Sequence, residues 1–193
     1  MTNLEFLLQR QSNPQLTEPA PNKTVIENIL AAGMRVPDHA GLKPWHFTVV
    51  SGEGLQRLSD LYVDAFKDIF SKPDNQATAE EIEQKLAKAK KMPFRAPLII
   101  VISTKLQAHE KVPEVEQVVA AGCCAHAMQM AATAQGFGAM WRTGDLAYNN
   151  IVKQGLGVAE QDHIIGFLYI GTPCRELPLK PSRSFVPHVD YWQ

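Results

Sequence analysis

The stretch Leu98-Ile99-Ile100-Val101-Ile102-Ser103 decides the fold class, because it is an apolar run of strand length with no polar alternation. Such a run is expected for a strand whose two faces are both covered by other elements. Residues 113–135 are the most strongly helical segment, and small or apolar residues occupy most of the helix circumference. A helix that is apolar on most sides is expected to be buried. We therefore expect a covered sheet with this helix packed against it.

Further strands and helices follow on either side of this pair. Aromatic and β-branched runs predict three more strands, at residues 45–51, 139–142 and 164–170. Apolar positions at helical spacing predict helices at residues 3–10, 23–35, 55–69, 80–91 and 149–156. No repeat or linker divides them, so we expect one α+β or α/β domain over residues 1–193. Residues 173–193 are rich in proline and predict an extended tail that packs on another surface, such as a second subunit.

The composition is that of a globular protein, with 45% hydrophobic and 20% charged residues among 193. Lysine and arginine number 19 against 20 aspartate and glutamate, so the net charge of -1 favours neither nucleic acid nor a membrane surface as a partner. The first ten residues show neither a basic leader nor an apolar stretch of signal-peptide length, and no later apolar run approaches about 18 residues, so we expect neither export nor membrane spanning. Two of the three cysteines, Cys123 and Cys124, are adjacent and cannot easily bridge each other. We therefore expect a cytoplasmic protein without a disulfide scaffold.

Side-chain catalysis has one candidate pair, Cys123 and His126. On a helix these residues would be neighbours, as a thiol nucleophile and its base must be, although cysteines are more often part of a core. Zinc requires three or four ligands, and no other cysteine or histidine cluster lies close in sequence. The acidic residues 80–83 are more typical of a solvated helix face than of a catalytic carboxylate pair. Phosphate-loop and hydrolase-elbow motifs do not occur.

Three arginines lie at predicted segment boundaries, each beside a polar residue. They are Arg10 with Ser12, Arg35 with His39, and Arg142 with Thr143. A guanidinium and a hydroxyl suit a phosphate monoester, because each charge-assisted hydrogen bond is worth about 1.5 to 3 kcal/mol. Each arginine alone is more often a surface cap, but together these boundaries can converge on one phosphate.

With these residues the chain resembles the FMN-dependent nitroreductase superfamily, and most closely its short bacterial NAD(P)H nitroreductases. The resemblance spans most of the chain and rests on motifs in a specific order. They are Arg10-Gln11-Ser12, residues 31–39 (AAGMRVPDH), 44–47 (PWHF), 93–100 (PFRAPLII), 127–132 (AMQMAA), 135–138 (QGFG), Trp141-Arg142 and 166–173 (GFLYIGTP).

The resemblance implies a nitroreductase-like α+β fold, with a central, mainly antiparallel sheet flanked by helices. It also implies a homodimer with FMN held without a covalent bond at the subunit interface, and a C-terminal extension that reaches the partner subunit. The FMN contacts would be Arg10, Gln11, Ser12, Arg35, His39, Trp141, Arg142 and Thr143, with Arg35 supplied by the other subunit. The segment offered to NADH or NADPH would be Ala131, Ala132, Thr133, Ala134, Gln135 and Gly136.

The implied activity is ping-pong hydride transfer through flavin N5, from NAD(P)H to nitroaromatic or quinone-like acceptors. Trp141 or Phe94 would complete an apolar wall for a flat acceptor. Two departures from the wider superfamily stand out: Lys43 lies where many members carry glutamine, and Ser12 replaces a second arginine, which leaves more of the phosphate charge to Arg35 and Arg142. Three alternatives remain. They are a thiol-dependent enzyme using Cys123 and His126, a flavin-binding module without turnover, and a different flavin task such as quinone, enone or dehalogenation chemistry.

Overall fold

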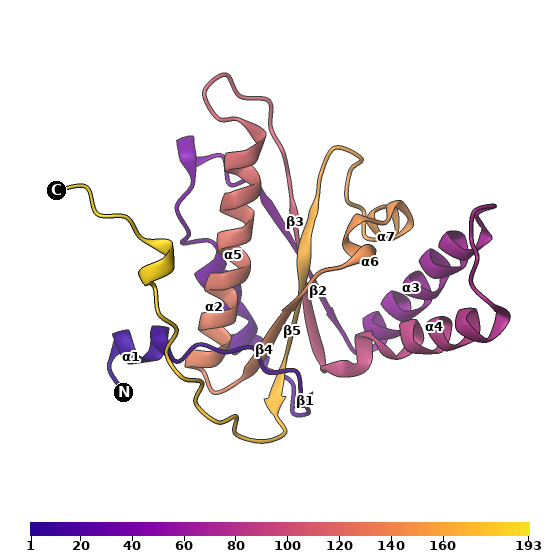
Figure 1. The fold of residues 1–193 in the computed structure, drawn as a ribbon, viewed down its shortest axis with the longest axis horizontal. Helices are drawn as coiled ribbons and strands as arrows, with labels where there is room; N and C mark the ends of the chain where they lie inside the picture. The colour runs from indigo at the N-terminus through magenta and orange to yellow at the C-terminus, as the bar shows by residue number, and fades with distance from the viewer.

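A computed structural model describes residues 1–193 and contains one five-stranded sheet in which every paired strand is antiparallel (Figure 1). The strand order is β1-β5-β3-β2, and β4 also pairs with β5. The strands are β1 Leu16–Thr17, β2 Trp45–Ser51, β3 Leu98–Thr104, β4 Gly138–Arg142 and β5 Ile164–Pro173. The predicted antiparallel sheet is confirmed.

Helices cover both faces of this sheet. Figure 1 shows α2 and α5 on one side and α3, α4, α6 and α7 on the other. The helices are α1 Asn3–Leu8, α2 Lys23–Gly33, α3 Glu53–Ser71, α4 Ala79–Lys91, α5 Glu114–Ala134, α6 Asp145–Tyr148 and α7 Asn150–Gly155. Three short 3-10 turns are η1 His39–Gly41, η2 Pro93–Arg95 and η3 Val186–His188. The predicted α+β arrangement of a flanked sheet is therefore confirmed.

The central strand β3 is buried along its whole length. Successive side chains of a strand point to opposite faces, so β3 supplies both cores. Ile100 packs with Ile29 of α2 and Met128 of α5, whereas Val101 packs with Tyr62 of α3. The unbroken apolar run predicted a strand covered on both sides, and the structure confirms it.

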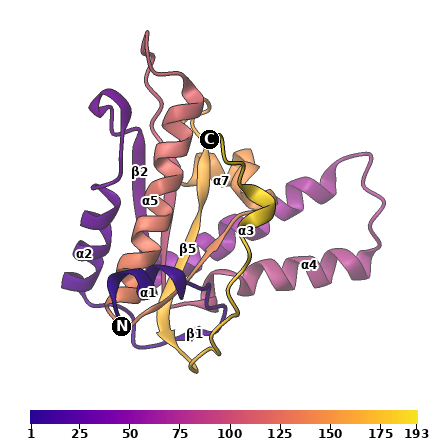
Figure 2. The same ribbon diagram turned by 60° about the vertical axis from the view of Figure 1, so that its left-hand side comes forward.

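Helix α5 differs from the expectation of burial on most sides. Its inner face, including Ala121 and Ala125, is buried against the sheet and α2. On the outer face, Val115 is 64% exposed and Val119 is 60% exposed, and Cys123 is exposed as well. Figure 2 shows α5 lying beside α2, with α1 near its C-terminal end. The helix therefore carries an uncovered apolar stripe, which its overall apolar composition does not reveal.

Some smaller elements and ends were predicted wrongly. Strand β1 was missed, because two residues are too few to show alternation. The helix predicted at residues 149–156 is α7, where extended Asn149 caps the helix by accepting from the Ile151 and Val152 amides, and the short helix α6 before it was missed. Strand β5 runs to Pro173 and not to residue 170. The helix predicted to reach residue 35 ends at Gly33, with Met34 as its C-cap.

The C-terminal tail after β5 is extended apart from η3. It is attached near its start, where the Cys174 amide donates to the Gln15 carbonyl over 3.1 Å. Further along, Phe185 is 62% exposed and Trp192 is 98% exposed. The tail thus presents aromatic side chains that this chain does not cover.

No helix of the structure has both the length and the apolar character needed to cross a membrane.

Candidate functional site

The segment after α1 lies beside strand β4. The Asn13 amide donates to the Ala139 carbonyl over 3.0 Å, and the Gln129 amide side chain of α5 donates to the same oxygen over 3.2 Å. This shared acceptor joins the N-terminal segment, α5 and β4 at one place. Arg10 lies just ahead of it and is half-buried, with its Nη1 donating to Ser12 Oγ over 3.5 Å.

Gln11 follows Arg10 in this segment, and only one end of its side-chain amide forms a hydrogen bond. Its Nε2 donates to the Leu177 carbonyl over 3.5 Å, which ties the tail to this segment. Its Oε1 is buried and has no hydrogen-bond partner. A buried polar atom without a partner costs about 1 to 3 kcal/mol, so this oxygen is suited to a donor brought by a ligand.

Trp141 and Arg142 at the end of β4 point to opposite faces of the sheet. Trp141 packs with the α2 and α5 core, and its Nε1 donates to the Ile165 carbonyl over 3.2 Å. The Arg142 guanidinium lies over the Tyr169 ring at 5.3 Å, on the α3 and α4 side. The two side chains therefore cannot contact one ring system from the same side, and Trp141 is engaged within its own chain.

Arg142 combines partial burial with an incomplete set of partners. Burial, and then the neighbouring Arg95 cation, lower the pKa of Arg142 from its ordinary value. The guanidinium still carries its charge at neutral pH, because arginine starts from such a high value. Its Nε is buried and has no hydrogen-bond partner. Two close cations and an unused donor are the features that an anionic ligand would satisfy.

Gly166 on β5 sets the position of the Trp141–Arg142 pair. A Cβ atom added at Gly166 would contact the Trp141 indole and would lie 2.8 Å from the Arg142 carbonyl. We predict that Gly166→Ala lowers the free energy of unfolding by about 1 to 3 kcal/mol, because the backbone carbonyl cannot move aside cheaply. Denaturant unfolding measures this change. Gly122→Ala is the control, since its nearest neighbour is Trp141 Cη2 at 4.0 Å, and an equal loss in both variants would contradict the prediction.

Arg35 and His39 lie elsewhere. Both are exposed, and His39 Nδ1 is 2.6 Å from Glu116 Oε2 at the N-terminal end of α5. The segment that carries Arg10 lies toward the other end of α5, where Asn13 and Gln129 share the Ala139 carbonyl. From Glu116 to Gln129 the helix rises about 20 Å at 1.5 Å per residue. One chain therefore does not bring His39 to the segment that carries Arg10.

The segment predicted for NAD(P)H is the last turn of α5 and its stop. Ala132 is buried in the core, and Thr133 Oγ1 donates to the Gln129 carbonyl. Gln135 Nε2 donates to the Ala131 carbonyl, and its Oε1 accepts from Asn28 of α2. Exposed Ala134 and Gly136, at φ +85°, complete the turn. Most of the polar groups in residues 131–136 are thus engaged in the fold.

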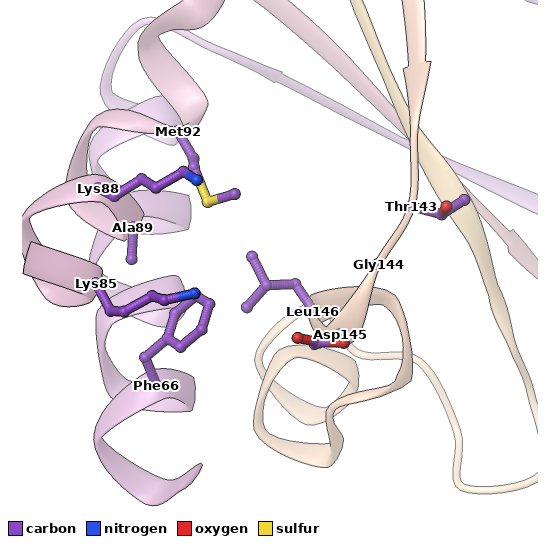
Figure 3. Close-up of a pocket in the computed structure, with 9 residues that line it drawn as sticks. All are labelled: Phe66, Lys85, Lys88, Ala89, Met92, Thr143, Gly144, Asp145 and Leu146. Carbon is purple, nitrogen blue, oxygen red and sulfur yellow. The ribbon is translucent and has the colours of Figure 1, made fainter. Parts of the chain in front are cut away.

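A pocket of about 240 Å³ lies between α4 and α6, next to β4 (Figure 3). Its one member from the predicted set is Thr143, the exposed residue after Arg142. The opposite wall carries Lys85 and Lys88. Neither lysine was predicted as a site residue, because a lysine-rich helix end is typical of a solvated face. Their spacing of three residues was the available signal, since it puts both on one side of a helix.

The thiol alternative finds little support in this geometry. Cys123 and His126 are both exposed on α5, and the hydrogen bonds of the chain do not include one between them. Cys124 is buried, and its Sγ donates to the Gly33 carbonyl over 3.3 Å. Burial raises the pKa of the Cys124 thiol to about 12, which keeps it protonated and unreactive at neutral pH.

The arrangement fits an anionic cofactor of the FMN kind. Gln11 Oε1 and Arg142 Nε are both buried without partners, and both belong to residues predicted to contact FMN. Arg10 with Ser12 offers the guanidinium and hydroxyl that a phosphate requires.

Solved structures with the same architecture belong to the nitroreductase class. The nitroreductase-like family protein from Bacillus cereus has a TM-score of 0.84 to this chain, covering 100% of it and 97% of the other chain at 21% identity. A nitroreductase with bound FMN from Bacteroides fragilis NCTC 9343 has a TM-score of 0.72, covering 98% of each chain at 20% identity. The fold is therefore nitroreductase-like.

The sequence gives the family itself. Residues 7–172 match the Nitroreductase family. A curated relative from Escherichia coli (strain K12), named "Putative NAD(P)H nitroreductase YdjA", is 46% identical over 197 residues, which cover 100% of both proteins. The chain belongs to the Nitroreductase family, as the resemblance in the sequence predicted.

Proposed function

We propose that this protein is an FMN-dependent NAD(P)H oxidoreductase that reduces nitroaromatic or quinone-like acceptors. The observation that carries the proposal is the pair of buried, unpartnered polar atoms, Gln11 Oε1 and Arg142 Nε, in residues predicted to contact FMN. The bound FMN of the Bacteroides fragilis nitroreductase, which shares this fold, supports the same cofactor here. When bound, FMN would supply hydride acceptance and donation at N5.

The side chains of this chain would bind and orient the cofactor. Arg10 and Ser12 would hold the phosphate, and Gln11 would accept a hydrogen bond through its free oxygen. Arg142 would direct its free Nε and its charge toward the electron-rich part of the ring, where a cation favours added negative charge. Thr143 is exposed and can donate at the same edge. Trp141, whose indole donates to the Ile165 carbonyl of its own chain, would hold the end of β4 in place beside the cofactor.

NADH or NADPH and the acceptor would react with the same flavin in turn, which gives ping-pong kinetics. The name of the Escherichia coli relative supports an NAD(P)H donor. Within residues 131–136, exposed Ala134 and Gly136 are the positions left open for a donor. The protein would therefore contribute a surface of backbone and small side chains here and not a cluster of charges.

We further propose a homodimer in which residues 1–193 act as one flavin-binding domain and each FMN contacts both chains. His39 contacts Glu116, about 20 Å along α5 from Gln129 at the Arg10 segment, so a second copy would supply His39, and Arg35 with it, to the cofactor that Arg10 holds. Exposed Val115 and Val119 on α5 would form part of the subunit interface. The tail from residue 173 would reach the partner.

A cytoplasmic location is part of the proposal. All three cysteines are unpaired, as expected for thiols kept in a reducing compartment.

An absorbance spectrum tests the function. The purified protein should show the visible bands of oxidised flavin, and these should bleach when NADPH or NADH is added without oxygen. Bands that persist with both donors would indicate a flavin-binding module without turnover. A colourless protein that takes up no added FMN would overturn the proposal.

A further inference from the structure

We propose that the pocket between α4 and α6 is the acceptor site, and that Lys85 and Lys88 make it selective for flat aromatic acceptors that carry a carboxylate. The inference rests on the proposed function, because it places this pocket beside the ring that Arg142 and Thr143 would hold. It adds a substrate class and two specificity-determining residues to that function.

The size and walls of the pocket suit a single aromatic ring. Its volume is about 240 Å³, below the roughly 300 to 1,000 Å³ typical of pockets for larger drug-sized ligands. Phe66, Met92 and Leu146 supply apolar and aromatic surface on two sides. Thr143 lines the pocket as well, just beyond the end of β4. A ring bound here would therefore lie against apolar side chains and reach the edge of the proposed flavin site.

The charged groups at the pocket favour an anion. Lys85 and Lys88 line it, and Asp145 is the carboxylate that lines it with them. In Figure 3 both lysine side chains extend from α4 toward Leu146, while Asp145 lies on the α6 side. The four ion pairs of the chain involve neither lysine. The ammonium groups are thus free to receive an acidic group of a ligand.

Two carboxylates near these lysines offset part of their charge. Hydrogen bonds from Thr78, and to a smaller extent the Lys85 cation, lower the pKa of Glu81 one turn before Lys85. Behind the pocket, Arg142 precedes Thr143 and lies over Tyr169, and it has no ion pair in the chain. The three cations therefore outnumber the carboxylates of Glu81 and Asp145, although the whole chain carries a net charge of -1.

The geometry of α4 explains how two lysines serve one ligand. Residues three apart on a helix are neighbours on its surface. The aliphatic stems of lysines commonly cover apolar surface while the ammonium groups stay in water. With Ala89 buried beneath them, Lys85 and Lys88 can border the pocket with their stems and meet a carboxylate at its opening.

The test compares two acceptors of nearly equal shape that differ in charge, para-nitrobenzoate and para-nitrobenzamide. We expect Lys85→Gln and Lys88→Gln each to lower the benzoate-to-benzamide ratio of kcat/KM about threefold, and the double variant about tenfold, as befits exposed charges. The ratio should also fall as salt approaches about 1 M, where the screening length is only about 3 Å. Lys91→Gln, at the end of α4 and outside the pocket, is the control and should leave the ratio unchanged.

A binding measurement separates this inference from the proposed function. Calorimetric titration of the oxidised protein measures the affinity for unreactive benzoate and benzamide. The lysine variants should bind benzoate more weakly by the same factors and should bind benzamide unchanged. An unchanged ratio in a yellow, active double variant would overturn the inference and leave the function standing. Loss of FMN from the double variant would also overturn it, because the lysines would then belong to the cofactor site. A protein that binds no FMN would overturn the function, whatever the titration shows.

Discussion

Protein carrying Arg10→Ala is expected to lose most of its FMN during purification. Arg10 is half-buried beside Ser12, and the tripeptide that they form with Gln11 is the predicted phosphate contact. A charge-assisted hydrogen bond to phosphate is worth about 1.5 to 3 kcal/mol, which corresponds to roughly 10- to 150-fold in affinity. Titration of the apoprotein with FMN, followed by flavin fluorescence, measures the dissociation constant directly.

The control for this variant is Arg57→Ala. Arg57 is an exposed arginine of α3 on the other side of the sheet from α5, and it is outside the predicted flavin set. Its replacement removes the same charge and should leave FMN affinity within about twofold, because distant exposed charges contribute little. Thermal unfolding of the two apoproteins checks that Arg10→Ala is folded. Full retention of FMN by a folded Arg10→Ala protein would remove Arg10 from the phosphate site.

Deleting residues 178–193 is expected to weaken the proposed dimer by at least about 100-fold. The tail carries apolar side chains that the chain itself leaves exposed, and each contributes about 1.5 to 3 kcal/mol when fully buried. These residues are Leu179, Phe185, Val186, Tyr191 and Trp192. The deletion retains Leu177, so the contact to Gln11 is kept. Sedimentation velocity over a range of protein concentrations measures the change, and FMN content should fall with it.

A matched variant separates apolar burial from charge. Lys180→Gln with Arg183→Gln removes two tail charges and keeps every apolar side chain, so it should sediment like the unaltered protein. The truncated chain should keep its far-ultraviolet circular dichroism, because the sheet and its helices end before residue 178. An unchanged sedimentation profile for the truncated chain would show that the tail does not hold a partner.

Local pattern was sufficient for two of the longer strands. The bounds of edge strand β2 were predicted correctly, and central β3 extends only one residue beyond its prediction, because both are rich in β-branched and aromatic residues. Strand β1 and helix α6 were missed, because two and four residues are too few for a periodic pattern to register. The exposed stripe of α5 was missed for another reason: apolar composition does not tell an exposed stripe from a buried face.

The candidate site was only partly predictable. Arg10 and Arg142 were predicted as site residues because each lies at a segment boundary, and residues from such boundaries can converge in the fold. That Trp141 and Arg142 face opposite sides of the sheet follows from strand alternation once β4 is known. Lys85 and Lys88 join Thr143 only through the packing of α4 against the rest of the fold, and a contact between residues so far apart leaves no trace in one sequence.

Asn13 shares the Ala139 carbonyl with Gln129 of α5, whereas His39 contacts Glu116 near the start of the helix, and this separation has a consequence for mixed assemblies. In a twofold pair with shared sites, each polypeptide lends its Arg10 end to one catalytic centre and its Arg35 end to the other. Co-assembly of a chain altered at Arg10 with a chain altered at Arg35 would then collect both lesions in a single centre and restore the remaining one. Two inactive parents would complement each other, a form of genetic rescue that independent centres do not permit.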